Sequence, residues 1–240
     1  MPLAGHAFLA LWNVIAPARE PEYDRWHSLE HVPERVASPG FRGARRYVNR
    51  ARTRHRYFTL YDVDTLDAFD TPEYRDLLAR PTPWSASMRP DFRNFLRVQC
   101  RTLLSQGTGI GGAIACLAAT DDIASGLASS LPAALTLDGV SGVHLGERAE
   151  SGVRVPFAAP PPADGPVREV SHIALIEALD QASARSALRH VQHAAGLAGL
   201  APDFGADVYV LALVFPGNDA AERTAHRRPN WAAPASKPTI

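Results

Sequence analysis

The side chains best suited to chemistry are concentrated in one short segment near the N-terminus. Five groups that can donate, accept or carry protons recur there at spacings of three and four: Tyr23, His27, Glu30, His31 and Glu34. At the period of an α-helix these five side chains share one stripe. A histidine beside a carboxylate can have its pKa moved across neutrality, which suits proton transfer near pH 7. The spacing therefore indicates acid/base chemistry on one helix face.

A second interpretation of the stripe makes it the solvent face of an amphipathic helix. Leu29, Val32 and Val36 would then pack on the opposite side of that helix. Two imidazoles and two carboxylates are unusual for such a face, which is more commonly made of lysine and glutamate. The corresponding function is that of a non-catalytic protein, either a small-ligand-binding module or a purely structural one.

A metal site is the third interpretation. His27 and His31 are four residues apart, and residues 27–31 (HSLEH) fit the H-x-x-E-H pattern of one class of zinc protease. That pattern is short, however, and such a site needs a third ligand. Pro33 should also kink or restart the helix, because proline lacks an N–H and clashes with the carbonyl of residue 29. We therefore expect no bound metal and no cofactor, and rank a metal-dependent enzyme below the other two possibilities.

The stripe belongs to a β-α-β-β-α-β pattern that occurs twice. Apolar runs predict strands over 6–15, 41–49, 56–63 and 92–104, and periodicity predicts helices over 22–37 and 65–79. The second half repeats the order with strands over 110–119, 143–149, 171–178 and 207–215 and helices over 121–137 and 183–198. This order is that of the ferredoxin-like, or split βαβ, arrangement. The sequence therefore predicts an α+β protein built from tandem ferredoxin-like repeats.

The domain organisation follows from the same pattern. A ferredoxin-like domain that carries the site is expected at 1–106, and a second, degenerate ferredoxin-like domain at 107–217. The glycine-rich stretch 106–112 is the natural junction, since it precedes a strand instead of following one as a phosphate-binding loop would. Residues 151–166 are predicted to form a long loop. Residues 218–240 are predicted to be a C-terminal tail.

Three short motifs in the first half carry a resemblance to a known family. Trp26, His31 and Pro33 are spaced as W-x-x-x-x-H-x-P, and they precede residues 39–41 (PGF) and 45–47 (RRY). In these motifs, residues 6–104 resemble the dimeric α/β-barrel superfamily, and within it the EthD-type and related uncharacterised proteins. The second half keeps only the pattern of elements and has no counterpart of the H-x-P motif.

The resemblance implies both a fold and a site. Antiparallel four-stranded sheets with helices on one face would pair as an α/β-barrel, within this chain or between two chains. A small aromatic or polyketide-like ligand would lie between sheet and helices. His31 would be the acid/base of a cofactor-independent lyase, isomerase or cyclase, and His27 and Glu30 would tune or orient it. Five aromatic or cationic side chains are predicted to bind the substrate: Trp26, Arg46, Tyr47, Tyr61 and Trp84.

Composition narrows the range of partners. Lys+Arg and Asp+Glu both total 25, and this zero net charge predicts neither nucleic acid nor an anionic membrane as partner. No apolar run approaches the roughly 20 residues of a membrane span, and the first residues lack the charged region of a signal peptide. Cys100 and Cys116 lie in apolar runs and are expected to be buried free thiols. We expect a cytoplasmic protein with a small organic substrate, and a homodimer if the barrel closes between chains.

Overall fold

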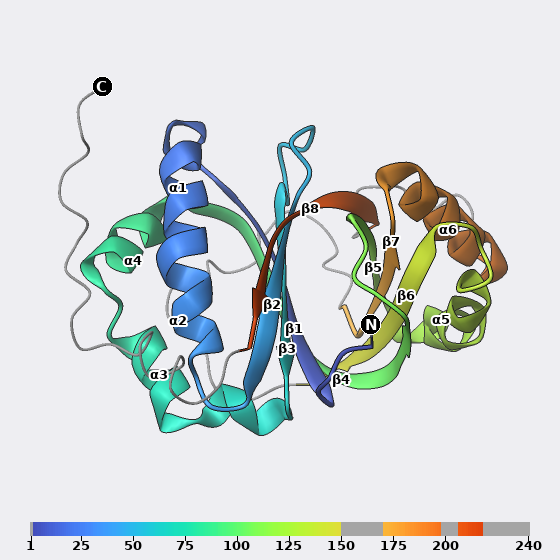
Figure 1. Cartoon of the computed structure of the whole chain (residues 1–240), viewed down its shortest axis with the longest axis horizontal. Coiled ribbons are helices and arrows are strands. Elements are labelled where there is room, and N and C mark those ends of the chain that lie inside the picture. Colours follow the sequence, from blue (N-terminus) through green and yellow to red (C-terminus); the bar gives the residue numbers. More distant parts are fainter. Residues whose placement is uncertain (1, 150–169, 198–205, 218–240) are drawn as a thin grey trace.

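The computed structural model describes residues 2–149, 170–197 and 206–217 (Figure 1). The first half supplies four strands: β1 (Ala7–Ile15), β2 (Phe41–Val48), β3 (Tyr57–Val63) and β4 (Phe92–Gly107). The second half supplies four more: β5 (Ala113–Ala119), β6 (Val140–Arg148), β7 (His172–Ala178) and β8 (Asp207–Pro216). All eight form one closed antiparallel barrel in the order β1-β3-β2-β8-β5-β7-β6-β4.

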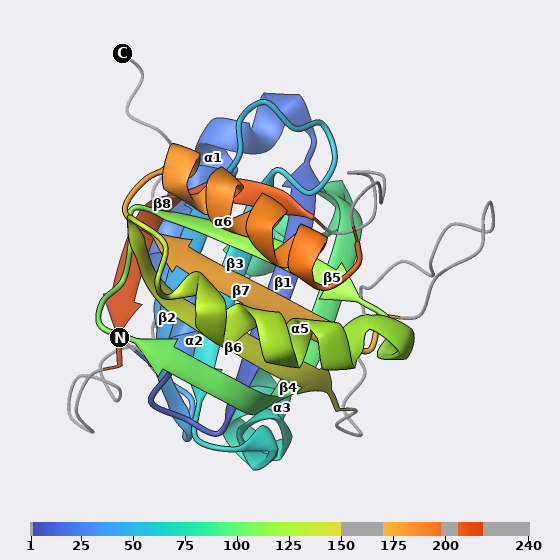
Figure 2. The ribbon, with the colours of Figure 1, turned by 90° about the vertical axis from the view of Figure 1, so that its right-hand side faces the viewer.

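Helices cover the barrel on two opposite sides (Figure 1). Beside the first half lie α1 (Glu20–Trp26), a π-helix (His27–His31), α2 (Val32–Val36), α3 (Pro72–Ala79) and α4 (Pro83–Met88). Beside the second half lie α5 (Asp121–Ala134) and α6 (Gln181–Ala194), which cross the sheet of β5, β7 and β6 (Figure 2). The predicted α+β fold with β-α-β-β-α-β order in both halves is confirmed.

The barrel closes within this one chain. Strand β2 pairs with β8, and β4 pairs with β6, so the two halves share hydrogen bonds along two seams. A second chain is not needed to close it, and the homodimer stays a prediction. The division at residues 106 and 107 also stays a prediction. The proposed loop at 151–166 and the proposed tail at 218–240 both lie outside the described residues.

Strands β1 and β3 are buried on both faces, which explains their largely apolar sequences. Successive side chains of a strand point to opposite faces, so Phe8 and Ala10 of β1 point into the barrel while Leu9 packs toward the helices. The interior of the barrel also holds Cys100 and Cys116, which are buried free thiols as expected.

One polar network crosses the barrel interior and connects the two halves. The Glu177 carboxylate accepts a hydrogen bond from the Arg45 guanidinium and another from the backbone N–H of Gly111, at 3.2 Å. His144 lies 3.3 Å from the same carboxylate and 2.8 Å from the Ser105 hydroxyl. Arg45 comes from β2 and Glu177 from β7, so their ion pair spans strands that are not neighbours in the barrel.

Two helical segments differ from the prediction because of proline. Residues 65–79 form a 3₁₀ turn (Leu66–Asp70) and then α3, since Pro72 excludes helical geometry from the preceding Thr71, which is extended. The stretch after Ala79, for which no helix is predicted, contains α4. Pro83 occupies the first turn of that helix, where proline is favourable, and the Thr82 hydroxyl caps it by accepting from the Ser85 N–H at 3.0 Å.

Among the described residues, none of the helices combines the length and apolar character that crossing a bilayer requires.

Candidate functional site

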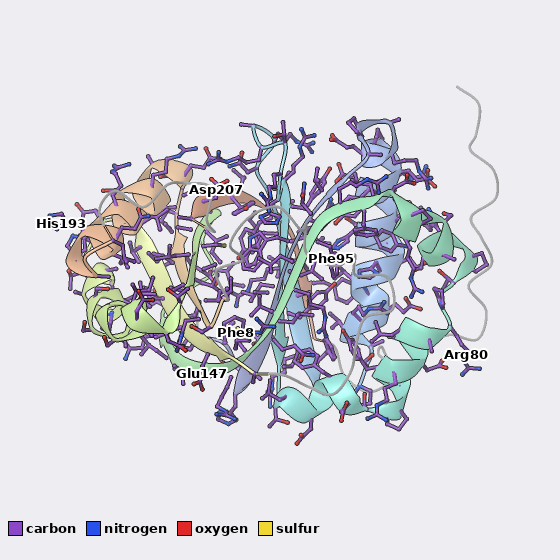
Figure 3. The ribbon with its side chains drawn as sticks, turned by 180° about the vertical axis from the view of Figure 1, so that it is seen from behind. Phe8, Arg80, Phe95, Glu147, His193 and Asp207 are labelled. Atoms are coloured by element: carbon purple, nitrogen blue, oxygen red, sulfur yellow. The ribbon has the colours of Figure 1, made fainter. Side chains whose placement is uncertain are left out.

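A cavity lies between the helices and the sheet of the first half. Its free space, counted to the open mouth, is about 610 Å³. Helices α1 to α4 and the π-helix contribute Tyr23, Trp26, His27, His31, Arg35, Tyr74, Leu78 and Ser85 to its lining. The strands and the turn before β4 contribute Leu9, Leu11, Phe41, Tyr61, Arg89, Phe92, Phe95 and Arg97. Figure 3 labels Phe95 on β4.

The helix that carries the histidines contains a π turn at the predicted kink. The backbone N–H of Val32 donates to the carbonyl of His27, five residues earlier. Pro33 cannot donate to the carbonyl of residue 29 and would clash with it in a regular α-helix. Widening the preceding turn relieves this conflict, so the helix continues instead of breaking. The π turn stacks the two imidazoles, with ring centroids 5.1 Å apart and planes at 30°.

The stripe of ionisable side chains faces the interior of the molecule. His27 and Glu30 are each only 2% exposed, whereas Leu29, expected on the packed side, is 58% exposed. The solvent-face interpretation is therefore wrong. Because the helix is enclosed between the sheet and α3 and α4, Val32 and Val36 are buried as well. Such a helix has more than one buried side, which a simple amphipathic pattern does not anticipate.

Both histidines are uncharged at neutral pH. Burial, and then the charges of Arg46 and Arg35, hold the pKa of His27 well below its usual 6.5. Burial also holds the pKa of His31 well below 6.5, followed by the effects of Arg35, His27 and Arg89. The Nδ1 atoms of both rings are buried and have no hydrogen-bond partner in the structure. A neutral imidazole has one N–H and one lone pair, so each ring keeps hydrogen-bonding capacity for a ligand.

Two tyrosines of the cavity remain protonated. Burial raises the pKa of Tyr23, whose hydroxyl donates to the Asn13 side chain at 3.0 Å. Burial also raises the pKa of Tyr61, and the hydroxyl of Tyr61 is buried without a partner. Tyr61 therefore offers an O–H donor for a ligand oxygen.

Of the residues that the structure describes, three arginines and no carboxylate line the cavity. Arg35 is 3.5 Å from the carboxylate of Glu34 and lies over the Tyr74 ring. Arg97 donates to the Tyr74 hydroxyl at 3.2 Å, and Arg89 donates to the backbone carbonyl of Leu78 at 2.9 Å. None of these three arginines was among the residues predicted for the site. Alternation along β4 places residues 95 and 97 on the same face, so a period-two pattern could have indicated Arg97.

Four of the eight residues predicted for the site meet at this cavity: Trp26, His27, His31 and Tyr61. The Trp26 ring lies 4.5 Å from that of His31, measured between centroids. The contact with Trp26 therefore holds the His31 ring from one side.

The other four predicted residues do not line the cavity. Glu30 accepts hydrogen bonds from Trp26 at 3.2 Å, from Ser85 at 2.8 Å and from Thr82, so its carboxylate ties the π-helix to α4. Trp84 donates to Glu22 at 3.2 Å beside the cavity. The two remaining residues are on β2.

Arg46 and Tyr47 are consecutive on β2 and therefore point to opposite faces. Arg46 pairs with Asp24 and lies 5.2 Å from the Tyr23 ring centroid, behind the cavity wall. Tyr47 points into the barrel interior, where it stacks with Phe58 at 5.7 Å. The structure thus places the phenol of Tyr47 on the other side of the sheet from His31.

A second and larger cavity, of about 910 Å³ when its free space is counted in the same way, opens at the mouth of the barrel. Trp12 and Tyr209 line it together with the turn that contains Arg54 and His55. Burial, and then the charge of Arg54, lower the pKa of His55 to about 4. This cavity lacks the paired imidazoles, so we place the candidate site in the first one.

The metal interpretation lacks its third ligand. Within residues 2–149, 170–197 and 206–217, no group of three or more His, Cys, Asp or Glu side chains could hold a metal ion. His27 and His31 therefore do not complete the coordination that a structural or catalytic zinc site requires.

Comparison with known proteins supports the fold. No family model and no curated protein matches the sequence. An anthrone oxidase-like protein has a similar structure, with a TM-score of 0.56 over 92% of this chain and 97% of that one, at 8% identity. A proposed monooxygenase from Fusobacterium nucleatum subsp. nucleatum has a TM-score of 0.50 over 89% and 95% of the two chains, at 12% identity. The expected α/β-barrel architecture is thereby confirmed, as a fold.

Proposed function

We propose that this chain is an EthD-like, cofactor-independent enzyme in which His31 transfers a proton to or from a small aromatic substrate. The observation that carries the proposal is the pair of stacked, neutral imidazoles whose Nδ1 atoms have no partner and which line an aromatic-walled cavity. Histidines that served only on a solvent-exposed face would not be enclosed in a cavity in this way. Buried polar atoms without partners in a cavity are typical of a site that a ligand completes.

The proposed step is proton abstraction from a C–H group that a carbonyl activates, either directly beside it or, as in anthrone, through a conjugated aromatic ring. His31 takes the proton through the lone pair that its low pKa leaves free, and the electron pair of the C–H bond moves onto the carbonyl oxygen. The Tyr61 hydroxyl would donate a hydrogen bond to this developing oxyanion. Return of the proton at another atom completes an isomerisation, and attack of the same enolate on a second carbonyl of the substrate would close a ring. In a decarboxylation, loss of carbon dioxide would itself form the enolate, which would then take up a proton.

The surrounding side chains favour a flat substrate. Trp26 and Phe92 are in edge contact, with centroids 5.9 Å apart, and Phe92 and Phe95 are in edge contact at 6.0 Å. Aromatic walls of this kind bind aromatic rings by stacking and edge-to-face contacts. Stacking of His27 on His31 holds the acid/base ring in one orientation.

A non-catalytic ligand-binding role is the second candidate. The low pKa of His31 favours it, because the uncomplexed imidazole is a weak base. The two candidates differ in the effect of removing His31, since a binding protein would show no turnover to lose.

The test is turnover of a panel of aromatic ketones, including anthrone, the compound class named for one structural neighbour. We expect His31→Ala to lower turnover by about 10²- to 10⁴-fold, the usual contribution of a general acid/base, with a nearly unchanged Tm. His190→Ala, on the exposed side of α6, is the matched control and should retain full activity. Turnover that survives His31→Ala would contradict the proposal. Binding of panel members with no turnover of any would favour the second candidate.

A further inference from the structure

We propose that the substrate is an aromatic anion, whose charged group lies among Arg35, Arg89 and Arg97 beside His31. This inference rests on the proposed function, because it names the substrate class of the same cavity. His31 would then act as a base when the anion is bound.

The charge of the cavity lining is one-sided. Three guanidinium groups reach it from three different elements: the end of α2, the turn before β4, and β4 itself. Within the described part of the chain, no aspartate or glutamate lines the cavity, and both histidines are neutral, so the described lining carries only positive charge. Glu34 offsets part of the charge of Arg35 from outside the cavity, at 3.5 Å. A positive lining in a poorly solvated site favours an anion.

The guanidinium groups are held in place before any ligand arrives. Tyr74 connects two of them, because its hydroxyl accepts from Arg97 and its ring lies 5.9 Å from the Arg35 Cζ atom. Arg97 also lies over the Phe69 ring at 5.6 Å, and Arg89 is bonded to the Leu78 carbonyl. Arginine presents a planar fork of donors that matches a carboxylate, and a fixed fork loses little entropy on binding.

Among the described residues that line the cavity, no side chain supplies a negative charge that would attract a proton to His31. The titratable and charged groups that face it across the cavity are Tyr23, His27, Arg35, Tyr61, Tyr74, Arg89 and Arg97. The nearby Glu30 carboxylate already accepts three hydrogen bonds from Trp26, Thr82 and Ser85. A bound carboxylate would add negative charge to this lining, and it would offset the cations that disfavour protonated His31.

This arrangement links anion binding to protonation. An anion beside Arg35 and Arg89 raises the pKa of His31 back toward 6.5, so His31 becomes a better proton acceptor when the substrate is present. By reciprocity, protonation of His31 tightens anion binding. Affinity should therefore increase as the pH falls from 8 to 6, since the bound state takes up protons more readily than the free state.

The test compares benzoate with its neutral isostere benzamide, by calorimetry on the full chain. We expect benzoate to bind at least about tenfold more tightly. Arg97→Ala and Arg89→Ala should each weaken benzoate about tenfold, the usual effect of removing one charge-assisted contact, and should leave benzamide unchanged. Tyr74→Phe keeps the charges and should have a smaller effect. Arg54→Ala, at the barrel mouth, is the matched control and should have none.

A second measurement follows His31 directly. In ¹⁵N-histidine NMR spectra, benzoate should raise the pH at which His31 titrates, and benzamide should not. Replacing His31 with Gln should remove the pH dependence of benzoate affinity. Equal binding of benzoate and benzamide would overturn the inference. Loss of benzoate binding in Arg54→Ala but not in Arg97→Ala would also overturn it, because the anion would then occupy the barrel mouth.

The inference and the proposed function fail separately. If His31→Ala abolishes turnover while benzoate shows no advantage over benzamide, only the substrate class is wrong. If benzoate binds as expected while turnover survives His31→Ala, the cavity binds anions and the catalytic role of His31 is wrong.

Discussion

The two helix-covered sides of this barrel have the same order of elements and very different contents. On the first side, aromatic rings, two imidazoles and three guanidinium groups line a cavity. On the second side, the space beneath α5 and α6 is filled by aliphatic side chains, many of them alanine: Ala113, Ala115, Leu117, Ala119, Leu127, Leu131, Ala134, Ala174, Ile176, Ala178, Ala184, Ala187, Leu188 and Val191. Small side chains let helices approach a sheet closely.

Two prolines that lie beyond the first turn of a continuous helix show the same contrast. Pro132 lies in the last turn of α5, and α5 remains an α-helix through it. Pro33 lies well inside the long helix of the first side, and the turn before it is a π-helix that carries both histidines. Single π turns occur frequently at functional sites. The repeated order of elements therefore supplies a scaffold, whereas the side chains between helix and sheet decide which copy holds a site.

The largest expected effect concerns the contact that joins the two sides. Glu177→Ala leaves the buried Arg45 guanidinium without its carboxylate, and we expect it to lower the free energy of unfolding by about 3–5 kcal/mol. Because the two halves share one barrel, chemical denaturation should remain a single transition. Replacing Arg45 and Glu177 together with leucine should cost much less, since no charge is then left unpaired. Two separate transitions in the wild type would show that the sides fold independently.

A second expected effect is a pH dependence of the free energy of unfolding that comes from the histidines of the first side. His27 and His31 stay neutral in the folded state, while in the unfolded chain they take up protons below pH 6.5. The unfolded state thus binds more protons as the pH falls, so each buried histidine lowers stability by about 1.4 kcal/mol per pH unit below 6.5. His55 adds to this slope down to its pKa of about 4. Urea denaturation between pH 7 and 5 measures the slope.

The control for this pH dependence is the double replacement of His27 and His31 with glutamine. Between pH 6.5 and 5, this variant should lose the part of the slope of unfolding free energy against pH that the two histidines contribute. An unchanged slope in the double variant would mean that both imidazoles are solvated, and the contrast between the two sides would lose its electrostatic part.

The smallest expected effect concerns packing. Ala187→Leu adds bulk to the filled second side and should lower the free energy of unfolding by about 1–3 kcal/mol without changing benzoate affinity. Leu78→Phe adds bulk beside the cavity of the first side. It should change stability by less than about 1.5 kcal/mol, because free volume is present, and should weaken benzoate binding. The reverse pattern, measured by denaturation and calorimetry, would contradict the difference in packing.

Local patterns in the sequence determined much of the scaffold. Hydrophobic periodicity located all eight strands and the main helices, because a strand or helix within a core must repeat its apolar residues at its own period. The stripe from Tyr23 to Glu34 also pointed to the helix that lines the cavity, and Pro33 indicated a local irregularity. These features depend on residues close together in the chain, so short-range spacing is sufficient to find them.

Only the tertiary structure decided which face of each element meets the cavity. Strands of a closed barrel covered by helices are buried on both faces, so the alternation that would separate Arg46 from Tyr47 is absent from their hydrophobic pattern. Likewise, α3 and α4 bury the histidine stripe and leave Leu29 exposed. Arg35, Arg89 and Arg97 converge because three separate elements meet there. That meeting depends on long-range packing, and no spacing along the chain encodes it.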